Sequence, residues 1–199
     1  HAALVAGRAG GHRREGHEVD IAVGPMPGSF DVTVVAVDRP GLLASIAGCF
    51  ALAGLDILGV QAFSMPDGIA LDTFTVRSAT RADIATDSWA RFERNLSAAL
   101  QERLAIGVRL AERQRHYRQS RTAAPEVRID ASDPYAAVVT VQAEDRLGLF
   151  FDVTRAISDS GLDIVGVTAT TRHGRAIDTF RVVDRDRQAP AEGLLGMLG

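Results

Sequence analysis

The sequence predicts an α+β fold made of two ferredoxin-like βαββαβ units, whose antiparallel sheets carry helices on one face. Two observations lead to this prediction. First, the stretch at 38–60 is repeated at 145–167, with Asp-Arg-x-Gly-Leu and Gly-Leu-Asp-Ile in matching places. Second, β-rich runs and runs of helical periodicity follow one another in the order typical of a split βαβ unit. A period this long indicates duplicated domains rather than a solenoid.

The elements of the first copy follow from its local patterns. A Val-rich strand ends at Asp-Arg-Pro-Gly, after which apolar residues recur at helical spacing. Pro40 is compatible with a helix start, and Gly54 is typical of a helix end. A Pro-Asp-Gly turn then joins two further strands. The expected elements are strands at 31–37, 55–63 and 69–76, and helices after 41, at 87–104 and at about 104–118.

The second copy repeats this order but ends early. Its expected elements are strands at 136–143, 162–170 and 175–183, a helix at 149–160 and a weak helix at about 190–198. We expect the segment 126–129 to close the sheet of the first copy, because a βαββαβ unit needs a fourth strand. A vacant edge would then remain in the second copy. We hypothesise that the segment 18–23 fills it, which would tie the two copies into one body.

Composition narrows the possible classes of function. The formal net charge of −3 offers no basic excess for a phosphate backbone, so no DNA partner is expected. The sequence has no apolar run long enough for a membrane helix, and the lone Cys49 fits a reduced, cytoplasmic setting. The five His residues lack metal-ligand spacing, and no catalytic set is recognisable. We therefore expect no metal, no cofactor and no catalytic residue in this chain.

The repeated motifs resemble the ACT domain, a small-molecule sensor module. The resemblance rests on three successive stretches, DRPGLLASIAG, LDILGV and DGIALDTFTV. A finer resemblance, which includes the connecting segment SWARFERNLSAALQERLAIGVRLAERQRHYR, is to the C-terminal tandem ACT domains of bifunctional PII uridylyltransferase/uridylyl-removing enzymes, in their actinobacterial form. The domains expected on this basis are a tail or linker at 1–17, a first ACT domain with its linker helix at 18–130, and a second ACT domain, truncated at its C-terminus, at 131–199.

The resemblance also implies a function. The chain would be a regulatory module that senses L-glutamine or another small amino acid, and it would not itself be an enzyme. Its parent would be a [protein-PII] uridylyltransferase that uses Mg²⁺ and UTP, acts on PII, and places its nucleotidyltransferase and HD domains upstream of His1. By resemblance, the ligand lies between the first loop of one copy and the second strand of the other. The implied residues are Asp38, Arg39, Gly41, Leu42, Leu43, Gly59, Val60 and Gln61, with Asp145, Gly148, Leu149, Phe150, Gly166, Val167 and Thr168.

Helix chemistry makes this turn suitable for an amino acid. A helix N-terminus presents unpaired N–H groups and a partial positive charge, to which an α-carboxylate can bind. Asp38 and Asp145 could accept from an ammonium group, or could simply cap their helices. Asp72 and Asp178 lie on the apolar face of their strands, and a carboxylate there needs a partner. We expect a structural role for this pair.

Other readings of single residues and of the whole chain stay open. Arg39 and Arg146 are expected at the solvated surface, and Leu147, which stands where the family has Pro, is expected to loosen the second turn. The alternative functions are a ligand-free assembly module and an RNA-binding pair, since RRM domains share the βαββαβ order. RRM domains need exposed aromatic residues on their central strands, and the Phe residues of the third strands are expected to face the helices instead.

Overall fold

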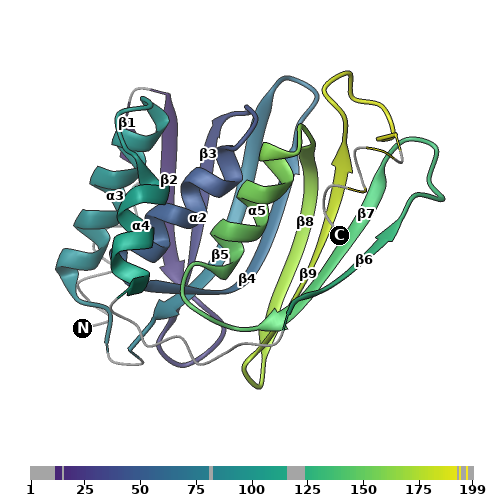
Figure 1. Ribbon diagram of the computed structural model, residues 1–199. Coiled ribbons are helices and arrows are strands. Elements are labelled where there is room, and N and C mark those ends of the chain that lie inside the picture. Colours follow the sequence, from purple (N-terminus) through teal and green to yellow (C-terminus); the bar gives the residue numbers. More distant parts are fainter. Residues whose placement is uncertain are drawn as a thin grey trace.

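One antiparallel sheet runs through the whole molecule, with the helices lying against one of its faces (Figure 1). This computed structural model describes residues 12–14, 16–80, 83–115, 124–191, 193 and 196. Within these residues the sheet has nine strands in the order β1-β2-β3-β5-β4-β8-β9-β7-β6. The two copies of the repeat therefore lie side by side, and their sheets join where β4 pairs with β8. No helix in the described ranges is long and apolar enough to cross a membrane.

The elements of the first half agree closely with the predicted ones. They are β1 (His12–Arg14), β2 (His17–Val23), β3 (Ser29–Val37), α2 (Leu42–Ala53), β4 (Leu55–Ser64), β5 (Ile69–Ser78), α3 (Thr86–Leu100) and α4 (Ile106–Arg115). Helix α2 ends at Gly54, whose φ of 79° is a left-handed conformation that glycine adopts without strain. Residues 116–118, the expected end of the α4 helix, lie outside the described ranges.

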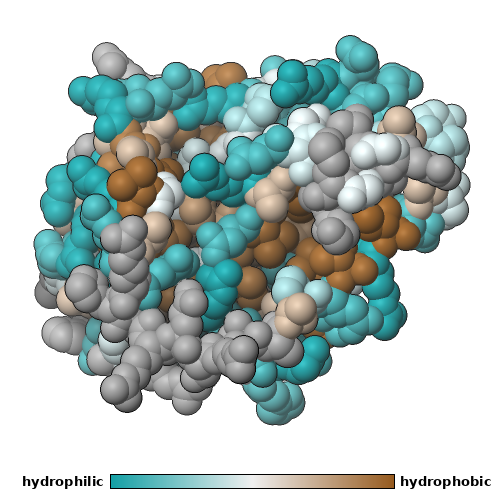
Figure 2. Space-filling model, in the orientation of Figure 1, coloured by the Kyte–Doolittle hydropathy of each residue, from teal (hydrophilic) through white to brown (hydrophobic). Residues whose placement is uncertain are grey.

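The second half repeats the central elements of the first. Its elements are β6 (Glu126–Asp130), β7 (Ala137–Glu144), α5 (Leu149–Asp159), β8 (Asp163–Arg172) and β9 (Arg175–Val183). The helix expected at about 190–198 falls largely on residues that are not described. Figure 2 shows the helix-bearing side, where apolar side chains gather over the part of the sheet formed by β7 and β9.

The predicted exchange of edge strands is wrong. Strand β2 pairs with β3 of its own half, in a register that joins Val19 to Val34, and does not reach the second half. Strand β6 pairs with β7 in the second half and does not close the first. Each half therefore forms its own hairpin, β2–β3 or β6–β7, and within the described residues β1 and β6 occupy the two edges of the sheet. The hairpin is the easier arrangement, because strands that are close in sequence lose less chain entropy when they pair.

The core lies between the sheet and the helices. On the sheet side it contains Phe74 and Phe180, both fully buried, as predicted from strand alternation. The Phe50 ring of α2 stacks on Phe92 of α3 at a centroid distance of 4.2 Å and lies 5.1 Å from the Phe74 ring of β5, which joins these two helices to the sheet. Aromatic pairs at this separation add to the stabilisation that comes from burial.

Helix α4 bridges the two halves on the outer side of the helix layer. It packs on α2, and its Ile106 lies beside Gly48 of α2 and close to Phe151 of α5. Arg113 of α4 donates to the carbonyl of Leu52, near the end of α2, at 2.6 Å. The linker between the two copies is thus part of the packed structure, and it touches both of the helices that begin at the repeated turn.

Candidate functional site

The repeated Asp-Arg-x-Gly turn has the same backbone geometry in both halves. Gly41 and Gly148 are the residues that precede α2 and α5, with φ of 76° and 81°, and neither helix has a side-chain cap. A left-handed residue here would be strained with most side chains, which explains the glycine. The first N–H of each helix, that of Leu42 or Leu149, donates back to the turn, and the N–H groups of the next two residues, which have no partners within a helix, remain available at the end of the turn.

Two corrections follow for this turn. The capping interpretation of Asp38 and Asp145 is wrong, because the capping position is held by glycine and no side chain caps either helix. The expected loosening by Leu147 is not seen in the backbone, since the bonds from Leu42 N–H to Arg39 and from Leu149 N–H to Arg146 measure 3.1 and 3.0 Å. The carbonyl of Leu147 also accepts from Gln114 of α4, at 3.4 Å.

Each turn forms one wall of a pocket at the junction of the two halves. The first pocket combines the turn before α2 with the beginning of β8 and the end of α5, and it is lined by Asp38, Arg39, Gly41, Leu42, Leu43, Ala62, Phe63, Ser64, Ala70, Asp72, Ser158, Asp163 and Ile164. The second combines the turn before α5 with the beginning of β4 and part of α2; its lining includes Asp56, Asp145, Arg146, Gly148, Leu149, Phe150, Thr171 and Asp178. The repeat thus produces two related pockets, each shared between both halves.

Three carboxylates meet at each pocket. In the first, Asp72 is only 3% exposed, and burial together with the nearby Asp38 raises its pKa to about 7, although the Phe63 backbone N–H opposes the shift. Burial and the charge of Asp38 likewise raise the pKa of Asp163, and the charge of Arg187 partly offsets this rise. At neutral pH Asp72 is therefore only partly ionised, and the closely placed carboxylates of this pocket form an environment that favours a bound cation.

The second pocket has the same electrostatic character. Burial and the neighbouring Asp145 raise the pKa of Asp178 to about 7. Burial and the charge of Asp56 raise the pKa of Asp145 to about 6, while Arg77 opposes the shift. The carboxylates on the apolar strand faces, Asp72 and Asp178, thus belong to the walls of the pockets. They are more than the structural groups that the sequence suggested.

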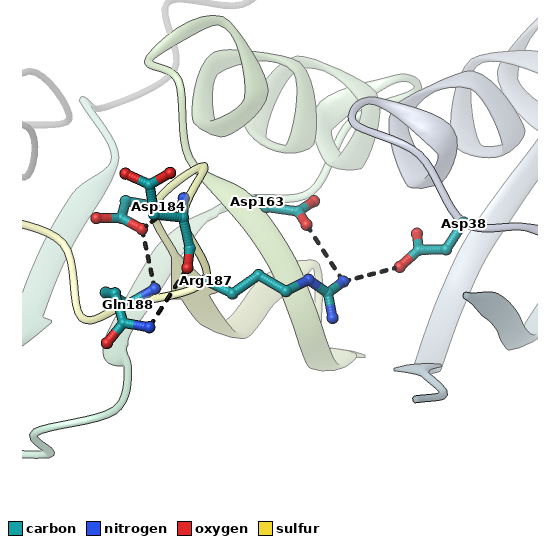
Figure 3. Close-up of polar contacts among 6 residues, drawn as sticks. Asp38, Asp163, Asp184, Arg187 and Gln188 are labelled. Atoms are coloured by element: carbon teal, nitrogen blue, oxygen red, sulfur yellow. Dashed lines mark hydrogen bonds and ion pairs between the residues drawn. The ribbon is translucent and has the colours of Figure 1, made fainter. Parts of the chain in front are cut away.

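Arginine side chains approach the carboxylates of both pockets. In the second, Arg77 of β5 contacts Asp56 of the adjacent strand β4 at 3.2 Å. In the first, Arg187 reaches from the turn after β9 toward Asp38 and Asp163, which belong to different halves (Figure 3). The two pockets therefore have carboxylates at matching positions of the repeat. The arginines that contact these carboxylates come from positions that do not match.

The arginines of the repeated turns are also held by the protein. Arg39 donates to the carbonyl of Ala99 at 3.2 Å and lies 3.4 Å from Glu102, at the end of α3. Arg146 pairs with Asp152 of its own helix at 2.6 Å. Their side chains are 32% and 35% exposed, so the expectation of simple solvated surface residues is wrong for both.

The structure brings only part of the implied site together. The loop residues of both copies line the pockets, while the strand residues Gly59–Gln61 and Gly166–Thr168 lie along the β4–β8 seam and line neither pocket. The strands contribute the flanking positions instead: residues 56–58 of β4 and 169–171 of β8 line the second pocket, and residues 62–64 of β4 and 163–164 of β8 line the first. A β-bulge precedes each glycine, between Ile57 and Gly59 and between Ile164 and Gly166. Gly59 and Gly166 thus mark strand irregularities at the seam.

Sequence reasoning missed two carboxylates that line the pockets, Asp56 and Asp163, and two arginines that contact pocket carboxylates, Arg77 and Arg187. Asp56 and Asp163 carried a signal, because the Leu-Asp-Ile triplet recurs in the repeat beside an otherwise apolar run. Arg77 and Arg187 carried none, since they do not occupy matching positions. Within the described part of the chain, no His, Cys, Asp and Glu side chains are grouped so as to hold a metal ion. Burial raises the pKa of the Cys49 thiol to about 12, so this side chain stays protonated.

The chain is similar to known proteins along most of its length. Residues 137–195 match the ACT domain family. Over 175 residues, 83% of this chain, the sequence is 35% identical to the bifunctional uridylyltransferase/uridylyl-removing enzyme of Gluconobacter oxydans (strain 621H). Over 176 residues it is 34% identical to the enzyme of that name from Rhodospirillum rubrum. Among solved structures, an aspartate kinase from Synechocystis covers 80% of this chain and 25% of its own, with 15% identity and a TM-score of 0.45.

These relatives are much longer than the chain described here. The chain spans 18% of the length of the Gluconobacter and Rhodospirillum enzymes. Both organisms are proteobacteria, so they lend no support to the expected actinobacterial type. The similarities support a regulatory role: the chain has an ACT domain match in its second half and resembles, along most of its length, a segment of uridylyltransferase/uridylyl-removing enzymes.

Proposed function

We propose that this chain is a glutamine-sensing regulatory module, composed of two ACT domains, of an enzyme that attaches uridylyl groups to PII and removes them. The observation that carries the proposal is the pair of related pockets, each with three carboxylates beside an uncapped helix N-terminus. A ligand in either pocket would contact both halves, so binding would favour one arrangement of the pair. Uridylyl transfer, with its UTP and Mg²⁺, would belong to other parts of the parent chain.

The charges of the pockets match glutamine better than glutamate. An amino acid has an α-carboxylate, which the helix N-terminus can bind. It also has an ammonium group, which can donate hydrogen bonds to the Asp side chains. The side-chain amide of glutamine adds two further donors. Glutamate would instead place a second carboxylate next to Asp38, Asp72 and Asp163 or their counterparts, and the like charges would repel. The pockets therefore favour a ligand with two donor ends and one acidic end.

Calorimetric titration with L-glutamine and L-glutamate tests the proposal directly. We expect glutamine to bind at least about tenfold more tightly than glutamate, because an unpaired charge in a partly buried site is costly. The variant Asp145→Asn should weaken glutamine binding in the second pocket, while Asp67→Asn, in the exposed turn between β4 and β5, should not. If no amino acid produces heat, the pockets do not sense amino acids and the assembly-module alternative gains support.

Glutamine binding is also expected to depend on pH. A bound ammonium stabilises ionised carboxylates and so lowers the pKa of Asp72 and Asp178 from about 7. The ligand must therefore displace protons at pH 6 but not at pH 8, and affinity should rise by up to about tenfold per pH unit for each proton released. Titrations in buffers of different ionisation enthalpy measure this release. Affinity that does not change between pH 6 and 8 would show that these carboxylates do not face the ligand.

The RNA-binding alternative has little structural support. Phe74 and Phe180, the aromatic residues of the third strands, are both fully buried between sheet and helices. Base stacking by an RRM-like sheet requires exposed aromatic residues on the central strands. These two positions therefore cannot provide that platform.

A further inference from the structure

The turn that follows β9 holds one arginine in a defined position. The carboxylate of Asp184 accepts from the N–H groups of Asp186 and Gln188, both at 2.9 Å. The N–H of Asp184 in turn donates to the carbonyl of Gln188 at 2.9 Å, and that of Arg187 donates to Asp184 at 3.0 Å. Arg187 has a φ of 59°, an uncommon left-handed conformation that these bonds maintain. Figure 3 shows its side chain extended from this turn toward the first pocket.

The guanidinium of Arg187 lies beside two carboxylates that line the first pocket. Its Nη2 is 3.5 Å from Oδ2 of Asp38 and 3.8 Å from Oδ2 of Asp163. The two Asp side chains are 12% and 21% exposed, whereas the Arg187 side chain is 55% exposed. A half-exposed cation thus covers two mostly buried carboxylates at the edge of the pocket. Because its contacts are long and solvent reaches it, the pairing is weak enough to be exchanged.

The second pocket differs at this point. There the arginine that pairs with the strand carboxylate Asp56 is Arg77, which belongs to β5 and lies directly across the ladder between β4 and β5. The Arg77 side chain is 33% exposed, and strands on both sides fix its backbone. A ligand could therefore enter the second pocket without moving a turn of the chain. In the first pocket, the cation comes from the turn at 184–188, which lies outside the strand ladders.

We propose that Arg187 is an internal competitor in the first pocket, a cation that the ammonium group of an amino-acid ligand must displace. The identity of the ligand rests on the proposed function above, but the competition itself rests only on the contacts with Asp38 and Asp163. Two consequences follow. The first pocket binds its ligand more weakly than the second, and its occupation releases the 184–188 turn from the first half. Ligand binding at the junction is thereby coupled to the segment that follows β9.

Residue-specific titration by nuclear magnetic resonance tests this competition. The backbone amides of Gly41 and Gly148 report separately on the first and the second pocket. We expect Arg187→Gln to lower the dissociation constant for L-glutamine at Gly41 about fivefold, the factor that corresponds to loss of one exposed ion pair. The constant at Gly148 should not change. Arg185→Gln, which removes the same charge from the same turn, serves as the matched control and should behave like the wild type.

A second probe keeps this test separate from the question of glutamine. Methylammonium chloride carries only the ammonium group, and it should shift the Gly41 amide at lower concentration in Arg187→Gln than in the wild type. An unchanged or weaker response at Gly41 in Arg187→Gln, with a ligand that does bind, overturns the competition. If glutamine binds to neither pocket in any variant, the proposed function fails, and the methylammonium series alone decides whether Arg187 occupies a cation site.

Discussion

Replacing Asp72 or Asp178 with Asn is expected to stabilise the protein at pH 8, by an amount that shrinks as the pH falls toward 4. Both carboxyls are buried, at 3% and 4% exposure, and burial is the largest cause that raises their pKa to about 7. The unfolded chain ionises the same groups near pH 4. Between these values the folded state binds more protons than the unfolded state, so the free energy of unfolding falls as the pH rises.

The size of this effect follows from the shift. Each pKa unit corresponds to about 1.4 kcal/mol, which makes the expected gain above pH 7 on the order of 4 kcal/mol for each Asn substitution. Urea unfolding followed by the fluorescence of the buried Trp89 gives the free energy at each pH. Asp20→Asn, which changes an exposed carboxylate on β2, is the control and should leave the pH profile unchanged. A wild-type profile that is flat from pH 4 to 8 would contradict the prediction.

These substitutions also bear on function. Active and binding sites commonly contain titratable groups with perturbed pKa values, and such groups often lower the stability of the folded protein. Carboxylates that lower stability above neutral pH are therefore consistent with a binding site. A bound ammonium would relieve the repulsion among Asp38, Asp72 and Asp163. Glutamine should therefore stabilise the wild type more at pH 8 than the Asp72→Asn variant, which thermal unfolding with and without ligand measures. Equal stabilisation of both proteins would separate Asp72 from the ligand.

Gly48→Ala is expected to destabilise the protein by about 2 kcal/mol, although alanine is the better helix former. A Cβ at this position would lie 2.9 Å from the Phe151 ring and closer still to Cγ2 of Ile106. Neither atom belongs to a flexible chain end, so α4 or α5 would have to shift. Overpacking of this kind costs about 1–3 kcal/mol, which outweighs the gain of about 1 kcal/mol in helix propensity.

Gly107→Ala provides the matched control for this prediction. Its Cβ would meet mainly the guanidinium of Arg155, the end of a flexible side chain that is 54% exposed. That group can move into solvent at little cost, so stability should stay unchanged or rise by up to about 1 kcal/mol. Urea unfolding of both variants measures the contrast. Equal changes in the free energy of unfolding from the two substitutions would show that close packing at the α2–α4–α5 junction does not determine the effect of Gly48→Ala.

The Gly48 prediction connects packing to the second pocket. Helix α4 contacts the turn before α5 through Gln114, which donates to the carbonyl of Leu147. A shift of α4 caused by Gly48→Ala should therefore alter the Gly148 amide more than the Gly41 amide. The first pocket depends instead on the end of α3, where Arg39 reaches Ala99 and Glu102. The two binding turns are thus held by different helices, although their own sequences are nearly the same.

The sequence by itself determined the repeated strand–turn–helix units, because these units depend on interactions between residues that are close in sequence. The left-handed glycines at 41, 54 and 148, the alternation that buries Phe74 and Phe180, and the turn at 65–68 follow from sterics and hydrophobic periodicity within a few residues. The sequence also singled out Asp38, Asp145, Asp72 and Asp178 as unusual carboxylates. These features act over short stretches of chain, so their patterns are visible without knowledge of the fold.

Only the tertiary structure decided which strands pair at the edges and at the seam, and hence which groups meet in each pocket. Strands β2 and β6 have patterns that suit either half, and only the fold places each in a hairpin with its neighbour. The pairing of β4 with β8 brings Asp163 to Asp38 and Asp56 to Asp145, and it leaves Gly59 and Gly166 at the seam. Arg187 reaches Asp38 across 149 positions of sequence. Such contacts depend on the relative placement of distant segments, which local periodicity does not encode.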